Sequence, residues 1–267
     1  MKGLYIFLFV LLLFFTFFIL KPNKPKSQIV VASQQQNNFQ HNNNNNNQAS
    51  IKFIFKEPLW KVSSKYPNYF NEVIQNNNLY RWNKINLYYY IEAKTGSRLN
   101  TAKIKRAFSH WERKSGVFRF YQTQNPKLAD IRIRLMTLSN KSRVGEGGPD
   151  DLIVGRTFEF NNKTYNENII KTASISASSE SFSFENVQKY EKAGIDAGFT
   201  MLVHEIGHVL GIMAHSSNQG DCMYYQMDAF AKSCNNLRAD ANTLAMLYGK
   251  SSSLNKGFYD IKEKVYY

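Results

Sequence analysis

The spacing of apolar side chains predicts several strands in the middle of the chain. Residues 85–92, INLYYYIE, are rich in aromatic and β-branched side chains, a composition typical of a strand. Residues 117–121 and 130–136 alternate apolar with polar positions, so each segment presents one apolar face. The arginines of the second segment lie on its opposite face. Paired charges on a strand are usually solvated, and we assign these arginines no catalytic role.

A further strand is predicted over residues 173–177, ASISA, where Ser alternates with Ala or Ile. Its small side chains leave room beside the backbone, and we expect it at an edge of the sheet. An exposed edge strand can bind an extended peptide through its free backbone groups. An ordinary edge strand without a ligand would have the same sequence, so both interpretations stay open.

Residues 145–151, GEGGPDD, combine glycines with acidic side chains and predict a flexible turn. Glu146, Asp150 and Asp151 carry the oxygen ligands that Ca²⁺ prefers, so a weak calcium site is one interpretation. Their spacing matches no EF-hand loop, and a plain surface turn is the preferred interpretation.

A helix is predicted after residue 100. Asn100 is a suitable N-cap, apolar residues recur at three- and four-residue steps as far as Trp111, and Gly116 ends the pattern. His110 adjoins Trp111 but lies on the more polar flank. We expect an exposed or partly packed histidine there rather than a metal ligand.

A second helix, from about Ala197, has an apolar face and carries the sequence HEIGH on its other side. Its His204 and His208 are four residues apart, which places both imidazoles on one face. Two neutral imidazoles at this spacing can bind one Zn²⁺, and Glu205 beside them is suited to acid–base work. A glycine then ends the helix, and His215 follows within reach of the same metal.

The N-terminal part of the chain differs in composition from the rest. Residues 1–32 contain an unbroken apolar run, residues 4–20, and are predicted to be a signal peptide or an uncleaved signal anchor. Residues 33–50 are rich in Gln and Asn and predict a disordered spacer, because they bury too little apolar surface to offset ordering. Residues 51–79 are interpreted as an N-terminal extension or a short pro-segment, and residues 250–267 as a C-terminal tail.

The formal net charge is +14, from 34 basic and 20 acidic residues. A basic balance attracts acidic partners, but the basic residues are scattered and no nucleic-acid-binding motif is present. The charge therefore predicts a solvated basic surface and no nucleic-acid partner. We expect a monomer that contacts a membrane only through its N-terminal segment, if that segment is not cleaved.

Two features favour export from the cell. Cys222 and Cys234 lie close together in the sequence, and in an oxidising compartment we expect them to form a disulfide. Asn140 and Asn162 each begin an N-x-S/T sequence and are candidate N-glycosylation sites. The chain is accordingly expected to be secreted, or anchored at the membrane by residues 4–20.

The stretch HEIGHVLGIMAH resembles the metzincin zinc peptidases, and in particular their matrixin branch. That family has the pattern HExxHxxGxxH followed by a turn that contains methionine. His204, Glu205, His208 and Gly211 match the pattern, whereas the third histidine, His215, comes one residue late. Further similarities are a Met-Tyr pair in the expected place, a final segment ending in Leu-Tyr-Gly and an Arg-Trp pair near the start. The resemblance extends over residues 80–249.

The resemblance implies an α+β metzincin catalytic domain, with a twisted mixed sheet of about five strands, two main helices and a small C-terminal subdomain after Gly211. It implies one catalytic zinc held by His204, His208 and His215. Met223 would form the structural turn beneath the metal. Tyr225 would either support the transition state or pack within the turn.

The implied activity is that of a zinc-dependent endopeptidase acting on proteins or peptides, with Glu205 as general base toward a zinc-bound water. A catalytically inactive zinc-binding module of the same fold is the alternative, because the late position of His215 leaves the third ligand to be tested.

Overall fold

The computed structural model describes residues 61–92, 100–135, 145–160, 162–177, 184–226 and 232–249. The apolar run 4–20, the Gln/Asn-rich spacer, Asn140 and the C-terminal tail lie outside these residues. In the part of the chain that is described, no helix is both long enough and apolar enough to cross a membrane.

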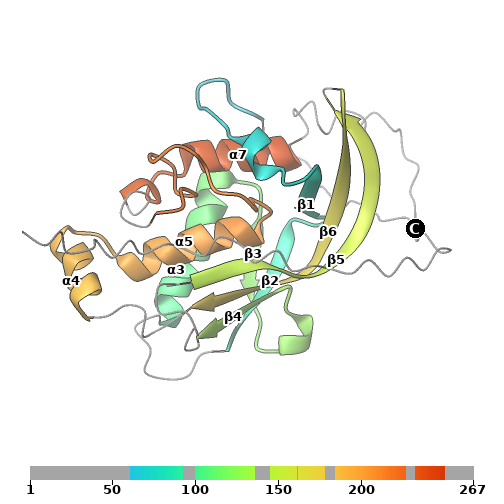
Figure 1. The fold of residues 1–267 in the computed structure, drawn as a ribbon. Coiled ribbons are helices and arrows are strands. Elements are labelled where there is room, and N and C mark those ends of the chain that lie inside the picture. Colours follow the sequence, from blue (N-terminus) through green and yellow to red (C-terminus); the bar gives the residue numbers. More distant parts are fainter. Residues whose placement is uncertain are drawn as a thin grey trace, which may run out of the picture.

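One mixed sheet forms the centre of the domain (Figure 1). Its strands are β1 (Asn78–Trp82), β2 (Asn86–Glu92), β3 (Arg119–Gln122), β4 (Ile131–Leu135), β5 (Gly145–Phe160) and β6 (Lys163–Ala177). The order is β1-β6-β4-β2-β3, all parallel, and β5 pairs antiparallel with β6. β6 pairs with β1 through its first half and with β4 through its second half, while β5 follows its other side.

The helices complete an α+β architecture. They are α2 (Phe70–Val73), α3 (Thr101–Ser115), α4 (Phe184–Lys192), α5 (Ala197–Val209) and α7 (Arg238–Tyr248), with a 3₁₀ turn η1 (Pro126–Leu128). The helices α3 and α5 pack against each other, and α5 also contacts β5 and β6. The core between helices and sheet is continuous and includes Trp82, Phe108 and Trp111, each at most 1% exposed.

The predicted first helix forms as its sequence indicates. The side chain of Asn100 accepts a hydrogen bond of 2.9 Å from the backbone N of Lys103, and Gly116 ends the helix with a φ of 64°. Its apolar positions, including Ile104 and Trp111, are buried. Both helix limits and the buried face are therefore confirmed.

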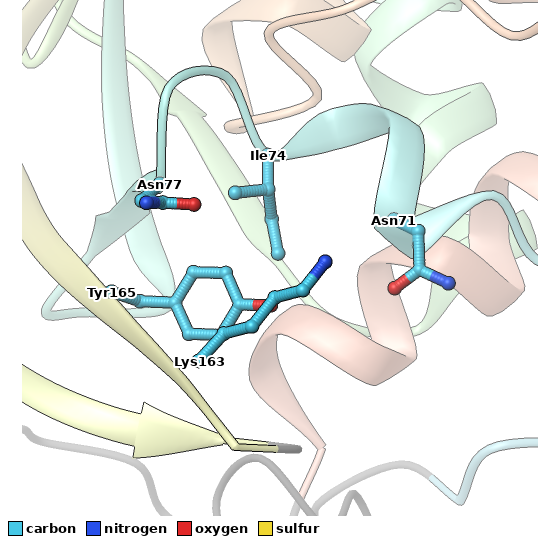
Figure 2. A pocket seen from close by; sticks show the side chains of 5 residues that line it. All are labelled: Asn71, Ile74, Asn77, Lys163 and Tyr165. Carbon is cyan, nitrogen blue, oxygen red and sulfur yellow. The ribbon is translucent and has the colours of Figure 1, made fainter.

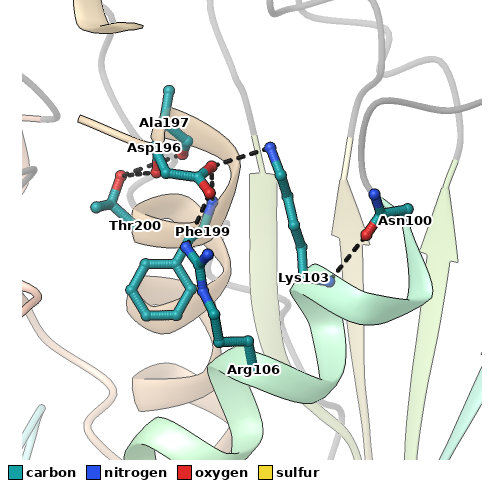
Figure 3. Close-up of polar contacts among 7 residues, drawn as sticks. All are labelled: Asn100, Lys103, Arg106, Asp196, Ala197, Phe199 and Thr200. Atoms are coloured by element: carbon teal, nitrogen blue, oxygen red, sulfur yellow. Dashed lines mark hydrogen bonds and ion pairs between the residues drawn. The ribbon is translucent and has the colours of Figure 1, made fainter. Parts of the chain in front are cut away.

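The N-terminus of α5 is fixed against α3 by Asp196 (Figure 3). Its side chain caps α5 by accepting from the backbone N of Phe199 at 3.1 Å, and it forms ion pairs with Lys103 at 3.0 Å and Arg106 at 2.8 Å. The guanidinium of Arg106 also lies over the Phe199 ring, 4.0 Å from its centroid. Although partial burial favours the neutral acid, the Lys103 and Phe199 hydrogen bonds hold the pKa of Asp196 below its usual value.

Two predictions about the strands are wrong, and they have one cause. Residues 173–177 are not an edge strand, because β6 lies between β4 and β5 there, and Ala173, Ile175 and Ala177 are fully buried. The segment GEGGPDD at 145–151 is not a turn but the beginning of β5, the strand beyond β6. Local composition identified the glycines but not the long hairpin that pairs them with β6.

The sheet also has six strands rather than five. Besides β5, β1 was not predicted as a strand, and it includes the Arg-Trp pair that the sequence placed before the first strand. Arg81 of β1 is 1% exposed and forms an ion pair with the buried Glu167 of β6, and it donates to the backbone oxygen of Leu247 at 2.7 Å. This buried arginine therefore connects β1, β6 and α7.

Residues 61–77, the part of the N-terminal extension that is described, pack against α7. The side-chain amide of Asn242 donates to the backbone oxygens of Ser63 at 3.0 Å and Tyr66 at 2.7 Å. The Tyr69 hydroxyl donates to Asp240 at 2.6 Å, and both side chains are buried. This segment is thus part of the folded domain.

Candidate metal centre

The helix α5 places His204, Glu205 and His208 inside the domain. All residues of α5 are buried, and these three polar side chains are each at most 1% exposed. The rings of His204 and His208 lie with their centroids 4.9 Å apart, as expected for residues one helical turn apart. Buried polar side chains such as these three need polar or metal partners, which the elements facing the helix must supply.

The loop after α5 brings His215 back to the helix. Gly211 has a φ of 102°, and a Cβ added there would lie 2.4 Å from the backbone oxygen of Tyr80 on β1, so only glycine fits this turn. The His215 ring centroid lies 5.3 Å from that of His204 and 5.0 Å from that of His208. The one-residue extension of the family pattern is therefore accommodated within the loop.

The three histidines converge on one point. One ring nitrogen from each of His204, His208 and His215 lies within 4.8 Å of the others, so the group could hold a metal ion. Nδ1 of His204 donates to the backbone oxygen of Cys222 at 2.7 Å, and Nδ1 of His208 donates to that of Ile212 at 2.7 Å. On these two rings Nε2 is therefore the nitrogen that could ligate a metal.

The surroundings keep these histidines neutral. Burial, followed by the neighbouring His215, lowers the pKa of His208 to about 3, and burial lowers that of His215 to about 4. Burial and the two other rings lower the pKa of His204 well below its usual value. Neutral imidazole is the form that ligates a metal, so this site is prepared for a cation without first losing protons near pH 7.

The side chain of Glu205, a residue of α5, faces the beginning of β5. A Cβ added at Gly145 would lie 3.0 Å from Oε1 of Glu205, and one added at Gly147 would lie 2.4 Å from its backbone oxygen. These two glycines allow β5 to pass directly beside the glutamate. The sequence signal was the spacing of glycines in GEGGP, which we interpreted as a turn.

Met223 lies against α5 at Gly207. It is fully buried, and a Cβ added at Gly207 would lie 2.3 Å from its sulfur. Gly207, the glycine within HEIGH, thus allows the thioether to contact the α5 backbone. The turn that contains Met223 is held by Asp240, whose carboxylate accepts from the backbone N of Met223 at 3.1 Å and of Cys222 at 3.3 Å.

Cys222 and Cys234 are joined by a disulfide in the structure, and both are fully buried. His110 is not on an exposed flank: it is 7% exposed, and its Nε2 donates to the backbone oxygen of Cys234 at 2.9 Å. It does not belong to the group of metal-ligating side chains found within the described residues. Burial, partly offset by this hydrogen bond, lowers its pKa.

Three other predicted residues lie away from a shared site. Asp150 accepts from Ser174 Oγ at 2.6 Å, and Asp151 lies 3.7 Å from Lys171. Together with Glu146 they belong to a strand, and in the described part of the chain they form no group that could hold a metal.

The two remaining predicted residues are exposed. Tyr225 is 40% exposed, with its ring centroid 4.5 Å from that of Tyr224. Asn162 lies in the turn between β5 and β6 with a φ of 59°.

A surface cavity of about 390 Å³ lies away from the histidines, where α2 faces the beginning of β6. Figure 2 shows Lys163 and Tyr165 of β6 across from Ile74 and Asn77, with Asn71 at one side. No sequence pattern indicates this cavity, because its walls come from two segments far apart in the chain.

A mixed sheet over two packed helices, with HExxH on the second helix, a third histidine beyond it and a buried methionine turn below, defines a metzincin-type catalytic domain. The chain belongs to the matrixin family, whose model matches residues 81–249. Matrixins are zinc-dependent, and the family supports a metallopeptidase.

The chain is similar to Karilysin of Tannerella forsythia. It is 34% identical over 148 residues, which make up 54% of this chain and 28% of the relative. The match thus spans little more than a quarter of that protein's length.

Proposed function

We propose that this chain is a zinc-dependent endopeptidase, with His204, His208 and His215 as metal ligands and Glu205 as general base. The observation that carries the proposal is the convergence of two buried histidines and a partly buried third, whose ring nitrogens lie within 4.8 Å of one another beside a buried glutamate. The family match supports the same class of activity.

The residues present fit a zinc ion. Nε2 of His208 and Nε2 of His215 are buried and form no hydrogen bond within the described residues. Burying such acceptors is costly unless something binds them, and a divalent cation is the partner that neutral imidazoles prefer. Three protein ligands are also the number typical of catalytic rather than structural zinc sites.

A bound Zn²⁺ supplies Lewis-acid activation of water and polarisation of the scissile carbonyl. Glu205 then accepts the proton of the attacking water and transfers it to the leaving amine. Its position is set by α5 on one side and by the glycines of β5 on the other. The backbone oxygens of Cys222 and Ile212 orient the first two histidines, and Met223 supports them from below.

The substrate is a protein or peptide bound in extended form along β5. Within the described residues β5 pairs only with β6, so its other side can accept a further strand. The part of β5 nearest the catalytic glutamate is Gly145–Gly147. The peptide-binding edge that the sequence suggested at 173–177 is therefore reassigned to β5.

We further propose that the protein acts outside the cell as a monomer, either secreted or anchored by residues 4–20. The Cys222–Cys234 disulfide and the exposed sequon at Asn162 support an oxidising, secretory route. The proposed organisation is a signal segment, a spacer over 33–50, an extension over 51–79, the catalytic domain over 80–249 and a tail.

The test compares the purified chain with its Glu205→Ala variant. We expect about one tightly bound zinc per chain in both, and cleavage of a mixed peptide library by the wild type only, with a rate loss of at least about 100-fold in the variant. Zinc content is measured by atomic absorption and cleavage by mass spectrometry. Zinc-loaded wild type that cleaves nothing would favour the inactive binding module, and a chain without zinc would refute both.

A further inference from the structure

The geometry points to a positioning role for the Cys222–Cys234 disulfide and for His110: together they fix the orientation of His204. The inference rests on the proposed metal site. It concerns how that site is held, through residues that neither bind the metal nor contact the substrate.

The first link is the backbone of Cys222. Its carbonyl oxygen accepts from Nδ1 of His204 at 2.7 Å, and this hydrogen bond sets both the tautomer and the plane of the ring. Its backbone N donates to Asp240 at 3.3 Å. The position of the carbonyl therefore decides where Nε2 of His204 points.

The second link fixes the other end of the bridge. The backbone oxygen of Cys234 accepts from Nε2 of His110 on α3 at 2.9 Å, and the Cys234 sulfur lies 3.6 Å from the backbone oxygen of Thr200 on α5. The His110 ring also meets the edge of Phe199, with centroids 5.5 Å apart. Cys234 is thus held between α3 and α5, and the disulfide transmits that fixed position to Cys222.

A disulfide can also act only by restricting the unfolded chain, which raises stability wherever it lies. The hydrogen bond from His204 to Cys222 separates the two roles, because a bridge that only restricts the unfolded chain would leave metal affinity unchanged. Both cysteines are fully buried, so reductants in solution do not reach the bridge in the folded protein. The bridge is a permanent part of the site rather than a redox switch.

The test uses the full chain and its Cys222→Ala/Cys234→Ala variant. Zinc affinity is measured by competition with a chromophoric chelator, and ligand geometry by the visible spectrum of the Co²⁺-substituted protein. Loss of an orienting contact to a metal-bound histidine typically weakens metal binding 10- to 100-fold, and we expect a fall of about that size with a changed cobalt spectrum.

A matched control separates positioning from general stability. Leu87→Ala removes a fully buried side chain from β2, which lies toward the opposite edge of the sheet from β5. It should lower the melting temperature of the metal-free protein without changing zinc affinity. His110→Phe keeps the disulfide but removes the hydrogen bond to the Cys234 backbone oxygen, and a measurable fall in zinc affinity, smaller than that of the double-alanine variant, is expected. Unchanged affinity in this variant would overturn the role of His110.

Wild type refolded with a phosphine reductant provides a second form without the bridge. The S–S bond breaks, each sulfur gains one electron and one proton, and the phosphine takes an oxygen from water to become its oxide. This form should match the double-alanine variant in zinc affinity, and it decides the question if that variant does not fold. Unchanged zinc affinity in the bridge-free forms would overturn the inference. Failure of the oxidised wild type to bind zinc would instead refute the proposed function.

Discussion

The two halves of the candidate site are held in different ways. His204, Glu205 and His208 lie within α5, where helical hydrogen bonds and the Asp196 cap fix the backbone. His215 lies in a loop whose course depends on distant residues: the Tyr80 carbonyl beside Gly211 and the Met223 oxygen that accepts from Ser216 N at 2.8 Å. A helix can place two ligands from local sequence, whereas a loop ligand requires the rest of the fold.

The largest difference is expected from replacing the loop ligand. His215→Ala removes one of three imidazoles and should reduce zinc affinity by more than about 100-fold, beyond what loss of an outer contact causes. His110→Ala, which removes a buried histidine outside the ligand group, should cost less than about tenfold. Competition with a chromophoric chelator measures both. Equal effects would show that the third ligand is wrongly assigned.

Substitution of Gly211, in the loop that carries His215, should also have a large effect on stability. Gly211→Ala places a Cβ against the Tyr80 backbone at a φ of 102°, and strain plus displacement should lower the free energy of unfolding by about 3–5 kcal/mol. Gly194 is the matched control, because its φ is 71° but a Cβ there would meet nothing within 4 Å. Gly194→Ala should cost about 1 kcal/mol in urea denaturation. If the two variants lose equal stability, the close approach to Tyr80 is not what shapes the loop.

Asp240, which holds the turn at Met223, should make the stability of the protein depend on pH. Burial, partly offset by the Tyr69 hydrogen bond, raises the pKa of Asp240 from its ordinary value of 3.8 to about 6. The folded state therefore prefers the neutral acid, so this stabilisation is complete below the unfolded pKa and is lost as pH rises from about 4 to about 6. The loss amounts to about 3 kcal/mol.

The measurement compares unfolding of metal-free wild type with that of Asp240→Asn across this pH range. The asparagine does not titrate, so the stability of wild type relative to the variant should fall as pH rises. A difference that stays constant between pH 4 and pH 6.5 would contradict a raised pKa at Asp240.

The smallest effect is expected in the helix half, at its cap. Asp196→Ala removes the α5 cap and two ion pairs with α3, and it should lower the free energy of unfolding by about 1–2 kcal/mol. Asp196→Asn keeps the cap, and most of that loss should be restored because partly exposed ion pairs contribute little. Thermal denaturation of the two variants tests this, and an asparagine variant that loses as much stability as the alanine variant would show that the ion pairs, not the cap, carry the stabilisation.

Local sequence patterns predicted the two main helices and several of the strands. Asn100 and Gly116 mark the ends of α3, and the apolar face of α5 leaves the HExxH residues together, because a helix has a fixed period. The strands over 85–92 and 130–136 were also found from composition and alternation. These features need only near neighbours in the chain.

The glycine-rich segment at 145–151 shows where local reasoning stops. Its composition suits a turn, yet it pairs with β6 and contacts Glu205 of α5, about 60 residues away in the chain. His110 similarly appeared to lie on a polar flank, but Cys234 supplies its buried hydrogen-bond partner. The partners of both features come from distant segments, which no local pattern reveals.

By itself, the sequence determined the residues of the candidate site, namely the histidines, the glutamate and the methionine turn, and the resemblance to matrixins. The tertiary structure decided which strand passes beside Glu205 and whether the late His215 reaches the other two histidines. Residue type and helical period are local properties, whereas strand pairing and loop course depend on backbone contacts such as that between Gly211 and Tyr80. Such contacts exist only once the whole domain is folded.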